Sequence, residues 1–550
     1  MMNKVLMVHP TDNVMVALKD LEIAENIEFE GQKITTTSPV KSKFKFALKD
    51  FEVGDEVIMY GVLVGKVTQP IKKGEALTVD NVKHAASDVV VRDRRTSWTK
   101  PDVSAFENRT FMGYHRNDGQ IGTQNMWLVV PLVFCENRNV LAAKEILEDK
   151  LGYSKGRDYD LDIDSLLQKI ENGSEGNAIL NDDIVIPLSE QKKNRVFKNV
   201  DGIKFLLHDG GCGGIRQDSD TLCQLLAGYL NNPNVAGATF LSLGCQNAQV
   251  DILQDAIKKV NPKFDKPVFY VEQQKSGAES DFISNIVKYT MAGLVEANKV
   301  ERQPAPISAL RLGLECGGSD GFSGISANPV IGYVSDMLVA LGASPILAEF
   351  PELNGVEQSL TDRCVEEKDA KRFVDLMAIY KQRAEAVGSG FDANPSPGNI
   401  KDGLITDAMK SAGAAKKGGS SPIVEVLDYT EQVTKPGLNL LCTPGNDVES
   451  TTALAGSGAT LITFSTGLGT PTGNPITPVV KVSSNSILAE RMKDIIDFNT
   501  GSVITGEDTI ATRAATMLEY LLAVASGKEE TNSMRMRHDD FIPWKRGISL

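Results

Sequence analysis

Four cysteines share one local pattern, in which an apolar, strand-like run ends in a thiol that is followed by small or polar residues and then a helical pattern. They are Cys135, Cys212, Cys245 and Cys316. Because ligands of an open α/β sheet bind outside the carboxyl ends of its strands, the recurrence predicts that the four thiols meet at one site. Thiolates suit soft metals and iron, so we expect a metal there. The alternative for each cysteine alone is a small buried hydrophobe.

A glycine-rich turn, ECGGSDGFSGISANP at residues 315–329, carries a second group of polar side chains. Ser319, Asp320, Ser323 and Asn328 lie in it, just ahead of an expected helix. Backbone N–H groups at a helix start attract anions, so the turn predicts a site for a substrate carboxylate. The alternative for Asp320 is an ordinary helix N-cap.

Two of the five histidines stand beside candidate sites. His208 lies four residues before Cys212, near the end of an apolar run, where an imidazole could be a general base or a metal ligand. The alternative is a satisfied core histidine. His9, Asp12 and Asn13 form a polar turn after the first strand, either an Asx-type turn or a finger that reaches into a site.

Other polar side chains follow buried strands in the carboxy-terminal half. Glu349 and Glu352, in AEFPE, come after one strand, where a carboxylate could hold a metal or exchange a proton. Asp447 in CTPGND and Thr466 in STGLGTPTGNP occupy corresponding strand ends. The sequence has no G-x-x-x-x-G-K-[ST] motif and no G-x-G-x-x-G after a strand, which argues against nucleotide binding.

Composition narrows the class of protein. The chain has 550 residues, 41% apolar and 24% charged, so it can bury several cores. A net charge of -14 without a clustered basic run argues against nucleic acid or an anionic membrane as a partner. The apolar stretches fall short of the roughly 20 residues that span a bilayer. Seven cysteines without a C-x-x-C pair or a signal peptide favour free thiols in a reducing cytoplasm.

The order of patterns predicts an α/β protein, with a small amino-terminal β module followed by two α/β domains that have mostly parallel sheets. Residues 1–87 alternate short apolar runs with turn residues, and residues 88–111 lack periodicity, as a linker does. Strand-like and helical runs alternate over 112–305, with a polar insertion at 154–200, and again over 306–550.

Long motifs of the last domain resemble those of a known family. They are CGGSDGFSGISANP, NPSPGN at 394–399, TPGNDVESTTALAGSG at 443–458 and the STG-GTP run. In these motifs the chain resembles the altronate/galactarate dehydratase family of sugar-acid hydro-lyases, over nearly its whole length and including an amino-terminal module similar to the SAF domain. The resemblance implies removal of water from a hexonate or hexarate to give a 2-keto-3-deoxy acid. It also implies a divalent metal, usually ferrous iron.

Within the family, PGNDVESTTALAGSG and GGSDG resemble the altronate branch. The resemblance therefore implies dehydration of D-altronate to 2-keto-3-deoxy-D-gluconate, in hexuronate (galacturonate) catabolism. Two positions depart from the family pattern: Leu468 stands where an arginine is usual, and the neighbours of Cys212 differ in GGCGG. Galactarate or another sugar acid stays open as the substrate.

The predicted site combines these residues with the resemblance. Catalytic roles fall on His208, His9, Asp12, Ser319, Asp320 and Glu349, substrate binding on Asn13, Ser323, Asn328, Asp447 and Thr466, and metal binding on Cys135, Cys212, Cys245, Cys316 and Glu352. For the base that takes the C2 proton, His208 is the first choice and His9 the second. A divalent cation, Fe²⁺ first and Mn²⁺ second, would assist loss of the C3 hydroxyl as a Lewis acid.

Alternatives of cofactor and of class stay open at this level. Three or four thiolates would also suit an iron–sulfur cluster with one open iron. The same enolate chemistry would permit a sulfo-lyase acting on a 2-hydroxy acid, and thiols that hold structural zinc would suit a non-catalytic sugar-acid binder. As partners we expect a small sugar acid and a second copy of the chain in a homodimer.

Overall fold

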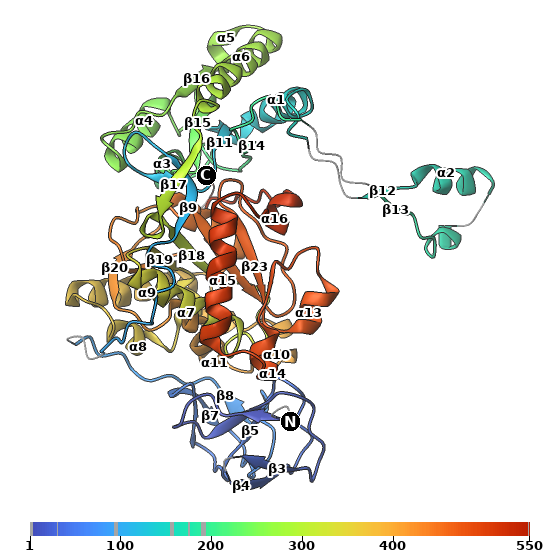
Figure 1. Cartoon of the computed structure of the whole chain (residues 1–550), viewed down its shortest axis with the longest axis vertical. Helices are drawn as coiled ribbons and strands as arrows, with labels where there is room; N and C mark the ends of the chain where they lie inside the picture. The colour runs from blue at the N-terminus through green and yellow to red at the C-terminus, as the bar shows by residue number, and fades with distance from the viewer. Residues whose placement is uncertain are drawn as a thin grey trace.

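The computed structural model describes residues 4–29, 31–92, 97–154, 159–173, 176–188, 194–547 and 549. The chain forms a small β module at its amino end and two larger α/β units whose main sheets are parallel (Figure 1). Along the long axis of the molecule, the carboxy-terminal unit lies between the module and the middle unit (Figure 1). The predicted fold class is confirmed.

The amino-terminal module consists of short antiparallel strands. They are β1 (Val5–Leu6), β2 (Val14–Ala17), β3 (Asn26–Phe29), β4 (Gln32–Thr35), β5 (Lys45–Ala47), β6 (Glu56–Met59), β7 (Val62–Val67) and β8 (Val82–Lys83). They pair as β1-β2-β5, β3-β4 and β6-β7-β8. Turn residues recur every few positions, which leaves no room for a helix, and none occurs in the described part of residues 4–92.

The middle unit has a parallel sheet in the order β14-β11-β15-β16. Its strands are β11 (Met126–Pro131), β14 (Gly202–Phe205), β15 (Val235–Ser242) and β16 (Val268–Glu272), and its helices are α1 (Asn137–Lys150), α3 (Arg216–Asn231), α4 (Val250–Val260), α5 (Gln273–Ser276) and α6 (Glu279–Ala297). β11 is buried along its whole length because it lies between neighbours and under helices on the sheet faces.

Two smaller sheets complete this unit. β9 (Thr110–His115), β10 (Ile121–Gly122) and β17 (Arg302–Pro306) pair antiparallel and bracket the unit in sequence. β12 (Tyr159–Leu161) and β13 (Val185–Pro187) pair with each other, with α2 (Ile163–Glu171) between them. This second pair lies apart from the rest of the chain (Figure 1).

The carboxy-terminal unit has a seven-stranded parallel sheet in the order β20-β21-β19-β18-β22-β23-β24. Its strands are β18 (Arg311–Cys316), β19 (Ser344–Leu347), β20 (Ile423–Leu427), β21 (Leu438–Leu441), β22 (Leu461–Thr466), β23 (Val479–Ser483) and β24 (Phe498–Asn499). Its helices are α7 (Ala327–Ala340), α8 (Glu357–Thr361), α9 (Glu367–Ala386), α10 (Pro397–Lys401), α11 (Asp407–Ala414), α12 (Asp447–Gly456), α13 (Ser486–Arg491), α14 (Gly501–Thr505), α15 (Ile510–Ala525) and α16 (Asn532–Arg535). The central strand β18 delivers its carboxyl end, Glu315 and Cys316, to the middle of the sheet edge.

Buried apolar clusters join the three units. One cluster contains Met59 of the module together with Phe322 of the carboxy-terminal unit, and a second contains Leu225 of α3 together with Leu454 of α12. Such shared cores hold the units in a defined arrangement. No described helix has the length and apolarity needed to cross a membrane.

Gly293 lets helix α6 lie directly against Trp127 of β11. A Cβ atom at this position would fall 1.9 Å from the Trp127 ring, which is fully buried. Gly293→Val should therefore destabilise the protein by about 2–3 kcal/mol through overpacking, seen as a lower Tm. Gly176→Val is the control, because a Cβ atom at Gly176 has no neighbour within 4 Å. An equal Tm for both variants would contradict this account of the packing.

Candidate active site

A buried group of acids, lysines and one thiol lies at the carboxyl ends of the strands in the carboxy-terminal unit. We call it the acid–lysine cluster, and its members are Glu315, Cys316, Glu349, Glu352, Lys410, Lys417, Asp447 and Lys481. All of them except Asp447 are buried. Charged groups are rarely buried unless they are paired, so this concentration marks a candidate site.

Lys417 is the central cation of the cluster. Its Nζ lies 2.6 Å from Oε2 of Glu349 and 2.7 Å from Sγ of Cys316. Both side chains of the Lys417–Glu349 ion pair are only 1% exposed. Burial by itself would lower the pKa of Lys417, but the thiol and the surrounding glutamates raise it well above its usual value. Lys417 is therefore a permanent positive charge inside the protein.

The Glu349 backbone is held in an uncommon conformation. Its φ of 65° lies in the left-handed region that residues other than glycine seldom adopt. Its N–H donates to Oγ1 of Thr443 at 2.8 Å, and its Oε2 accepts from the N–H of Cys316 at 3.0 Å. Such strain is found most often at functional sites, and here it directs the carboxylate into the cluster.

A second lysine neutralises the second glutamate. Nζ of Lys410 lies 2.7 Å from Oε1 of Glu352 and 2.7 Å from Oδ1 of Asn394. Oε2 of the same carboxylate accepts from Sγ of Cys316 at 3.2 Å. Burial opposes ionisation of Glu352, but Lys410 and Lys417 outweigh it and lower its pKa.

Glu315 is the acid of the cluster that burial and a neighbouring carboxylate shift toward the protonated form. Burial, and next the negative charge of Glu349, raise its pKa well above the usual value. Its Oε2 accepts from Oγ of Ser450 at 2.7 Å, whereas Oε1 of Glu315 and Oε1 of Glu349 have no hydrogen-bond partner among the described residues. A proton on Glu315, shared with Glu349, would give both Oε1 atoms a hydrogen-bond partner. The other three acids of the cluster would then be matched in number by its three lysines.

Lys481 is the cluster's unpartnered amine. The residue is 0% exposed, and its Nζ has no hydrogen-bond partner within the described part of the chain. The nitrogen lies 3.4 Å from the centroid of the Phe464 ring. Burial lowers the pKa of Lys481 to about 7, with Asp447 as the main opposing charge. An amine that exchanges its proton near neutral pH is suited to general base catalysis.

Two sets of side chains in the cluster have the spacing of metal ligands. The ligand atoms of Cys316, Glu349 and Glu352 lie within 4.8 Å of one another, and so do those of Glu315, Glu349 and Asp447. The second set includes Glu315 and Glu349, each of which has one carboxylate oxygen without a hydrogen-bond partner among the described residues, and carboxylate oxygens suit Fe²⁺, Mn²⁺ and Mg²⁺. The residues therefore fit a divalent metal ion. In the first set, Lys417 already supplies a cation to the thiol and to Glu349.

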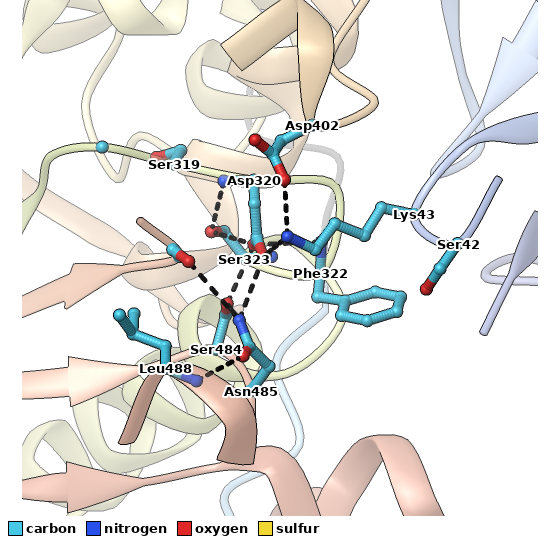
Figure 2. Close-up of polar contacts among 12 residues, drawn as sticks. Ser42, Lys43, Ser319, Asp320, Phe322, Ser323, Asp402, Ser484, Asn485 and Leu488 are labelled. Carbon is cyan, nitrogen blue, oxygen red and sulfur yellow. Dashed lines mark hydrogen bonds and ion pairs between the residues drawn. The ribbon is translucent and has the colours of Figure 1, made fainter. Parts of the chain in front are cut away.

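Asp320 joins this sheet edge to the amino-terminal module (Figure 2). Its Oδ1 accepts from the N–H of Phe322 and of Ser323, and also from the hydroxyl of Ser484. Its Oδ2 lies 3.0 Å from Nζ of Lys43, a residue of the module. Every acceptor position is used, so in this arrangement Asp320 organises the turn. It is not the N-cap residue of α7, which is Ser326.

The other predicted residues of this turn and of the β22 end have structural hydrogen bonds. Asn399 donates to the carbonyl of Ser319, and Oγ of Ser323 donates to Asp320. Asn328 donates to the carbonyl of Gly413 and accepts from Ser465, while Oγ1 of Thr466 accepts from the N–H of Gly469. These contacts keep the strand-end turns in shape around the cluster.

The predicted residues of the module form a tight turn between β1 and β2. Asp12 accepts from the N–H groups of His9 and Gly61, and Asn13 bonds to the backbone of the strand that contains Ile58. The ring of His9 is exposed and lies 2.8 Å from Oγ1 of Thr11. The module contacts Asp320 through Lys43, which sequence reasoning did not single out.

The four patterned cysteines divide between two sheets. Cys135, Cys212 and Cys245 follow the adjacent strands β11, β14 and β15 of the middle unit, and we call these three the cysteine edge. Cys316 ends β18 in the other sheet. Among the described residues, no member of the cysteine edge belongs to a group of three ligand atoms within 4.8 Å. The sequence pattern correctly indicates strand ends, but it cannot tell which sheet receives each strand.

His208 lies beside the cysteine edge with both ring nitrogens engaged. Its Nε2 is 2.7 Å from the carbonyl of Pro131, and its Nδ1 accepts from the N–H of Gly210 at 3.1 Å. Burial lowers its pKa, so the ring is neutral. A cavity of about 730 Å³ opens next to it, lined by Asn137, His208, Asp209, Cys212, Phe541 and Lys545 among others. To act as a base, His208 would first have to give up one of its backbone contacts.

The acid–lysine cluster and the region of the cysteine edge approach each other at the first turn of α12. Asp447 belongs to the acid–lysine cluster, and burial raises its pKa to about 7. Two residues later, Glu449 has its pKa raised to about 6, by burial and by the negative charge of Asp209 next to His208. Acidic groups of both units therefore face this short segment of helix.

Several residues of the site were not among those predicted from the sequence. Glu315 and Lys481 left a detectable signal, because each is a charged residue inside an otherwise apolar strand, LRLGLEC and PVVKV. Lys410 and Lys417 lie between expected strands and left none. Lys43, in a turn of the module, likewise has no sequence pattern that marks it as a site residue.

Replacing Lys417 by methionine should leave Glu349 as an uncompensated buried charge. We expect Lys417→Met to lower the free energy of unfolding by about 3–5 kcal/mol in urea denaturation, and Glu349→Gln in the same chain to recover part of the loss. Lys371→Met is the control, because its ion pair with Glu367 is at the surface. If Lys417→Met lost no more stability than the control, the ion pair would not be important to the fold.

Lys43→Met should loosen the junction between module and carboxy-terminal unit, because it removes the cation shared by Asp320 and Asp402. We expect a loss of about 1–3 kcal/mol and faster cleavage between the units in limited proteolysis. Exposed Lys41 provides the control Lys41→Met. Unchanged proteolysis of Lys43→Met would show that the ion pairs of Lys43 are not needed to hold the junction.

Three family models match the chain. "Altronate/galactarate dehydratase SAF domain" matches residues 3–85, "D-galactarate dehydratase/Altronate hydrolase, second domain" matches 113–298, and "D-galactarate/Altronate dehydratase, C-terminal" matches 307–549. These ranges correspond to the module and to the two α/β units.

Curated relatives align over nearly the full length. An altronate dehydratase of Bacillus subtilis (strain 168) is 32% identical, with all of both chains covered, and one of Escherichia coli (strain K12) is 32% identical, with 99% of both covered. The galactarate dehydratase (L-threo-forming) of Escherichia coli (strain K12) is 30% identical, covering 96% of this chain and 93% of the relative. The resemblance seen in the motifs is confirmed, and the chain belongs to the altronate/galactarate dehydratase family.

Proposed function

We propose that this protein is a sugar-acid dehydratase whose substrate is D-altronate and whose product is 2-keto-3-deoxy-D-gluconate. The observation that carries the proposal is the buried acid–lysine cluster, at the edge where α/β sheets bind ligands, in a chain similar from end to end to altronate dehydratases. The substrate preference rests on the altronate-branch motifs and on the names of these two relatives.

Dehydration needs a base for the C2 proton and an acid for the C3 hydroxyl. We propose Lys481 as the base, because its nitrogen is unpartnered and has a pKa near 7. We propose Glu315 as the acid, because burial raises the pKa of its carboxyl well above the usual value, so this carboxyl holds its proton more strongly than an ordinary glutamate. His208 and His9 remain the alternatives for the base that the sequence predicts.

Removing a proton beside a carboxylate creates an enolate with extra negative charge, which must be stabilised in place. Lys410 and Lys417 are fixed cations in a dry environment, where their charge acts more strongly than in water. A divalent metal, for which we propose Fe²⁺ with Mn²⁺ as second choice and an iron–sulfur cluster as the alternative, would add Lewis-acid stabilisation of the substrate oxygens. The acid–lysine cluster and the cysteine edge are the two candidate places for iron.

Other parts of the proposal rest on the family resemblance. We propose that the enzyme works as a homodimer in the cytoplasm, in hexuronate (galacturonate) catabolism. Galactarate is the second candidate substrate, because a galactarate dehydratase aligns over 96% of the chain. A sulfo-lyase and a non-catalytic sugar-acid binder remain the alternatives of a different class.

The test of the reaction is anaerobic turnover with Fe²⁺ and a thiol, offering D-altronate and galactarate in parallel and measuring the 2-keto-3-deoxy product. We expect product from altronate. Product from galactarate alone would keep the dehydratase and overturn the substrate. If neither is consumed, sulfite release from a 2-hydroxy sulfonate would identify the sulfo-lyase, and metal binding without turnover would identify the binder.

The test of the base is Lys481→Met. We expect it to lower kcat by about 100-fold or more, and to abolish exchange of the C2 proton with deuterated solvent, because the proton acceptor is gone. The surface variant Lys371→Met should retain both the dehydration rate and the exchange of the C2 proton. If His208→Asn abolishes the exchange and Lys481→Met does not, the base is His208.

A further inference from the structure

The exposure of the seven free cysteines divides them into two classes. Four are buried, namely Cys223, Cys316, Cys364 and Cys442, as free cysteines usually are. Cys135 and Cys245 are exposed and Cys212 is half-buried. These three less buried thiols are the three members of the cysteine edge. If each were only a packing residue, their shared exposure at one sheet edge would have no explanation.

The three thiols sit on loops that touch one another. β14, β11 and β15 lie side by side and run parallel, so their carboxyl ends share one edge (Figure 1). The N–H of Phe134 donates to the carbonyl of Gly210, and the N–H groups of Asn247 and Ala248 donate to the carbonyl of Gly211. The loops that carry Cys135 and Cys245 are thus both hydrogen-bonded to the loop that carries Cys212.

Gly211 brings these loops together. Its φ is 95°, and a Cβ atom there would fall 2.0 Å from the carbonyl oxygen of Leu132. Only glycine allows this approach between the Cys212 loop and the end of β11. The sequence GGCGG therefore holds its thiol next to the Cys135 loop by a backbone constraint.

The spacing of the thiols disfavours a single ion. A tetrahedral metal draws its sulfur ligands to within about 4 Å of one another, since each bond is about 2.3 Å long. The three thiols do not form such a group. In a four-iron iron–sulfur cluster each cysteine binds a different iron atom, so its thiolates stand farther apart.

Three cysteines can bind only three of the four irons of such a cluster, which leaves the fourth iron free to bind a ligand. The cavity beside the cysteine edge has room for that ligand. Cys212 lines the cavity of about 730 Å³ together with Asn137, His208, Asp209 and Lys545. Oδ1 of Asn137 is buried and has no hydrogen-bond partner among the described residues. A small polyhydroxy acid fits a space of this size and could use these polar groups.

The other thiol with nearby acids is less suited to iron. Cys316 is already in contact with Lys417 at 2.7 Å and with Glu352 at 3.2 Å. A dication there would have to displace an ammonium group that is itself buried and paired. Among the described residues, no cation is hydrogen-bonded to a sulfur atom of the cysteine edge, and the only hydrogen bond to these atoms is the one from Gln274 to Cys245.

We propose that Cys135, Cys212 and Cys245 hold a four-iron iron–sulfur cluster whose fourth iron, without a protein ligand, faces the cavity lined by His208 and Asp209. The role of the iron–sulfur cluster as the Lewis acid of the dehydratase rests on the proposed function, whereas its binding to the three cysteines does not. With the substrate in this cavity the base would be His208, the alternative given under the proposed function, because Lys481 does not line the cavity. Cys316 is not a ligand, and the four thiols therefore do not act as one set.

The experiment uses the full chain, purified anaerobically and reconstituted with ferrous iron and sulfide. We expect about four iron atoms and four acid-labile sulfides per chain, with a broad absorption near about 400 nm that bleaches on reduction. Iron bound without sulfide, or no iron at all, would overturn the proposal.

Single variants identify the ligands. Cys135→Ser, Cys212→Ser and Cys245→Ser should each lose most of the absorption and of the bound iron, whereas Cys316→Ser and the control Cys223→Ala should retain them. Thermal unfolding of the iron-free proteins checks that each variant is folded. A full cluster in any of the first three variants, or its loss in Cys316→Ser with the fold intact, would overturn the assignment.

The outcome for the cluster is separate from the outcome for the reaction. A cluster on the three cysteines in a protein that does not dehydrate altronate would support this inference and contradict the proposed substrate. Full altronate turnover by a cluster-free Cys212→Ser protein would overturn the catalytic role of the cluster while leaving the dehydratase in place.

Discussion

The buried contacts of Lys417 are the constraint on which the candidate site depends. This ammonium group touches both Cys316 at the end of β18 and Glu349 after β19, so it ties two neighbouring strand ends together. Without it, the buried carboxylate of Glu349 would lose its paired cation, which is strongly destabilising. The left-handed backbone at Glu349 directs its carboxylate into this contact, and burial together with the charge of Glu349 raises the pKa of Glu315.

The arrangement of the three units follows from shared apolar cores, and polar contacts then give the junctions their specificity. Phe322 of the turn after β18 packs with core residues of the module, while the neighbouring Asp320 receives Lys43. On the other side, α12 packs against α3, which begins just after the cysteine edge. The carboxy-terminal unit is thus held from both sides at the edge where its strands end.

Much of the architecture could be predicted from local patterns. Alternating strand-like and helical runs require parallel sheets, and short runs between turn residues require a small β module, so the fold class and the family were accessible from the sequence. The predicted domain limits and the predicted roles of single residues remain predictions. The cysteine pattern shows where prediction from sequence stops. The pattern marks four strand ends, because a strand end depends on neighbouring residues. It does not say which sheet each strand joins, because strand pairing depends on residues far apart in the chain.

By itself, the sequence determined the family, the order of the three units and the positions at which polar side chains follow buried strands, since these depend on residues close together in the chain. Only the tertiary structure decided which of those side chains meet. It placed Lys410 and Lys417 against glutamates some 60 residues away in sequence, separated Cys316 from the other strand-end thiols, and engaged both nitrogens of His208. The physical reason is that burial and charge compensation act between groups brought together in space, whatever their separation along the chain.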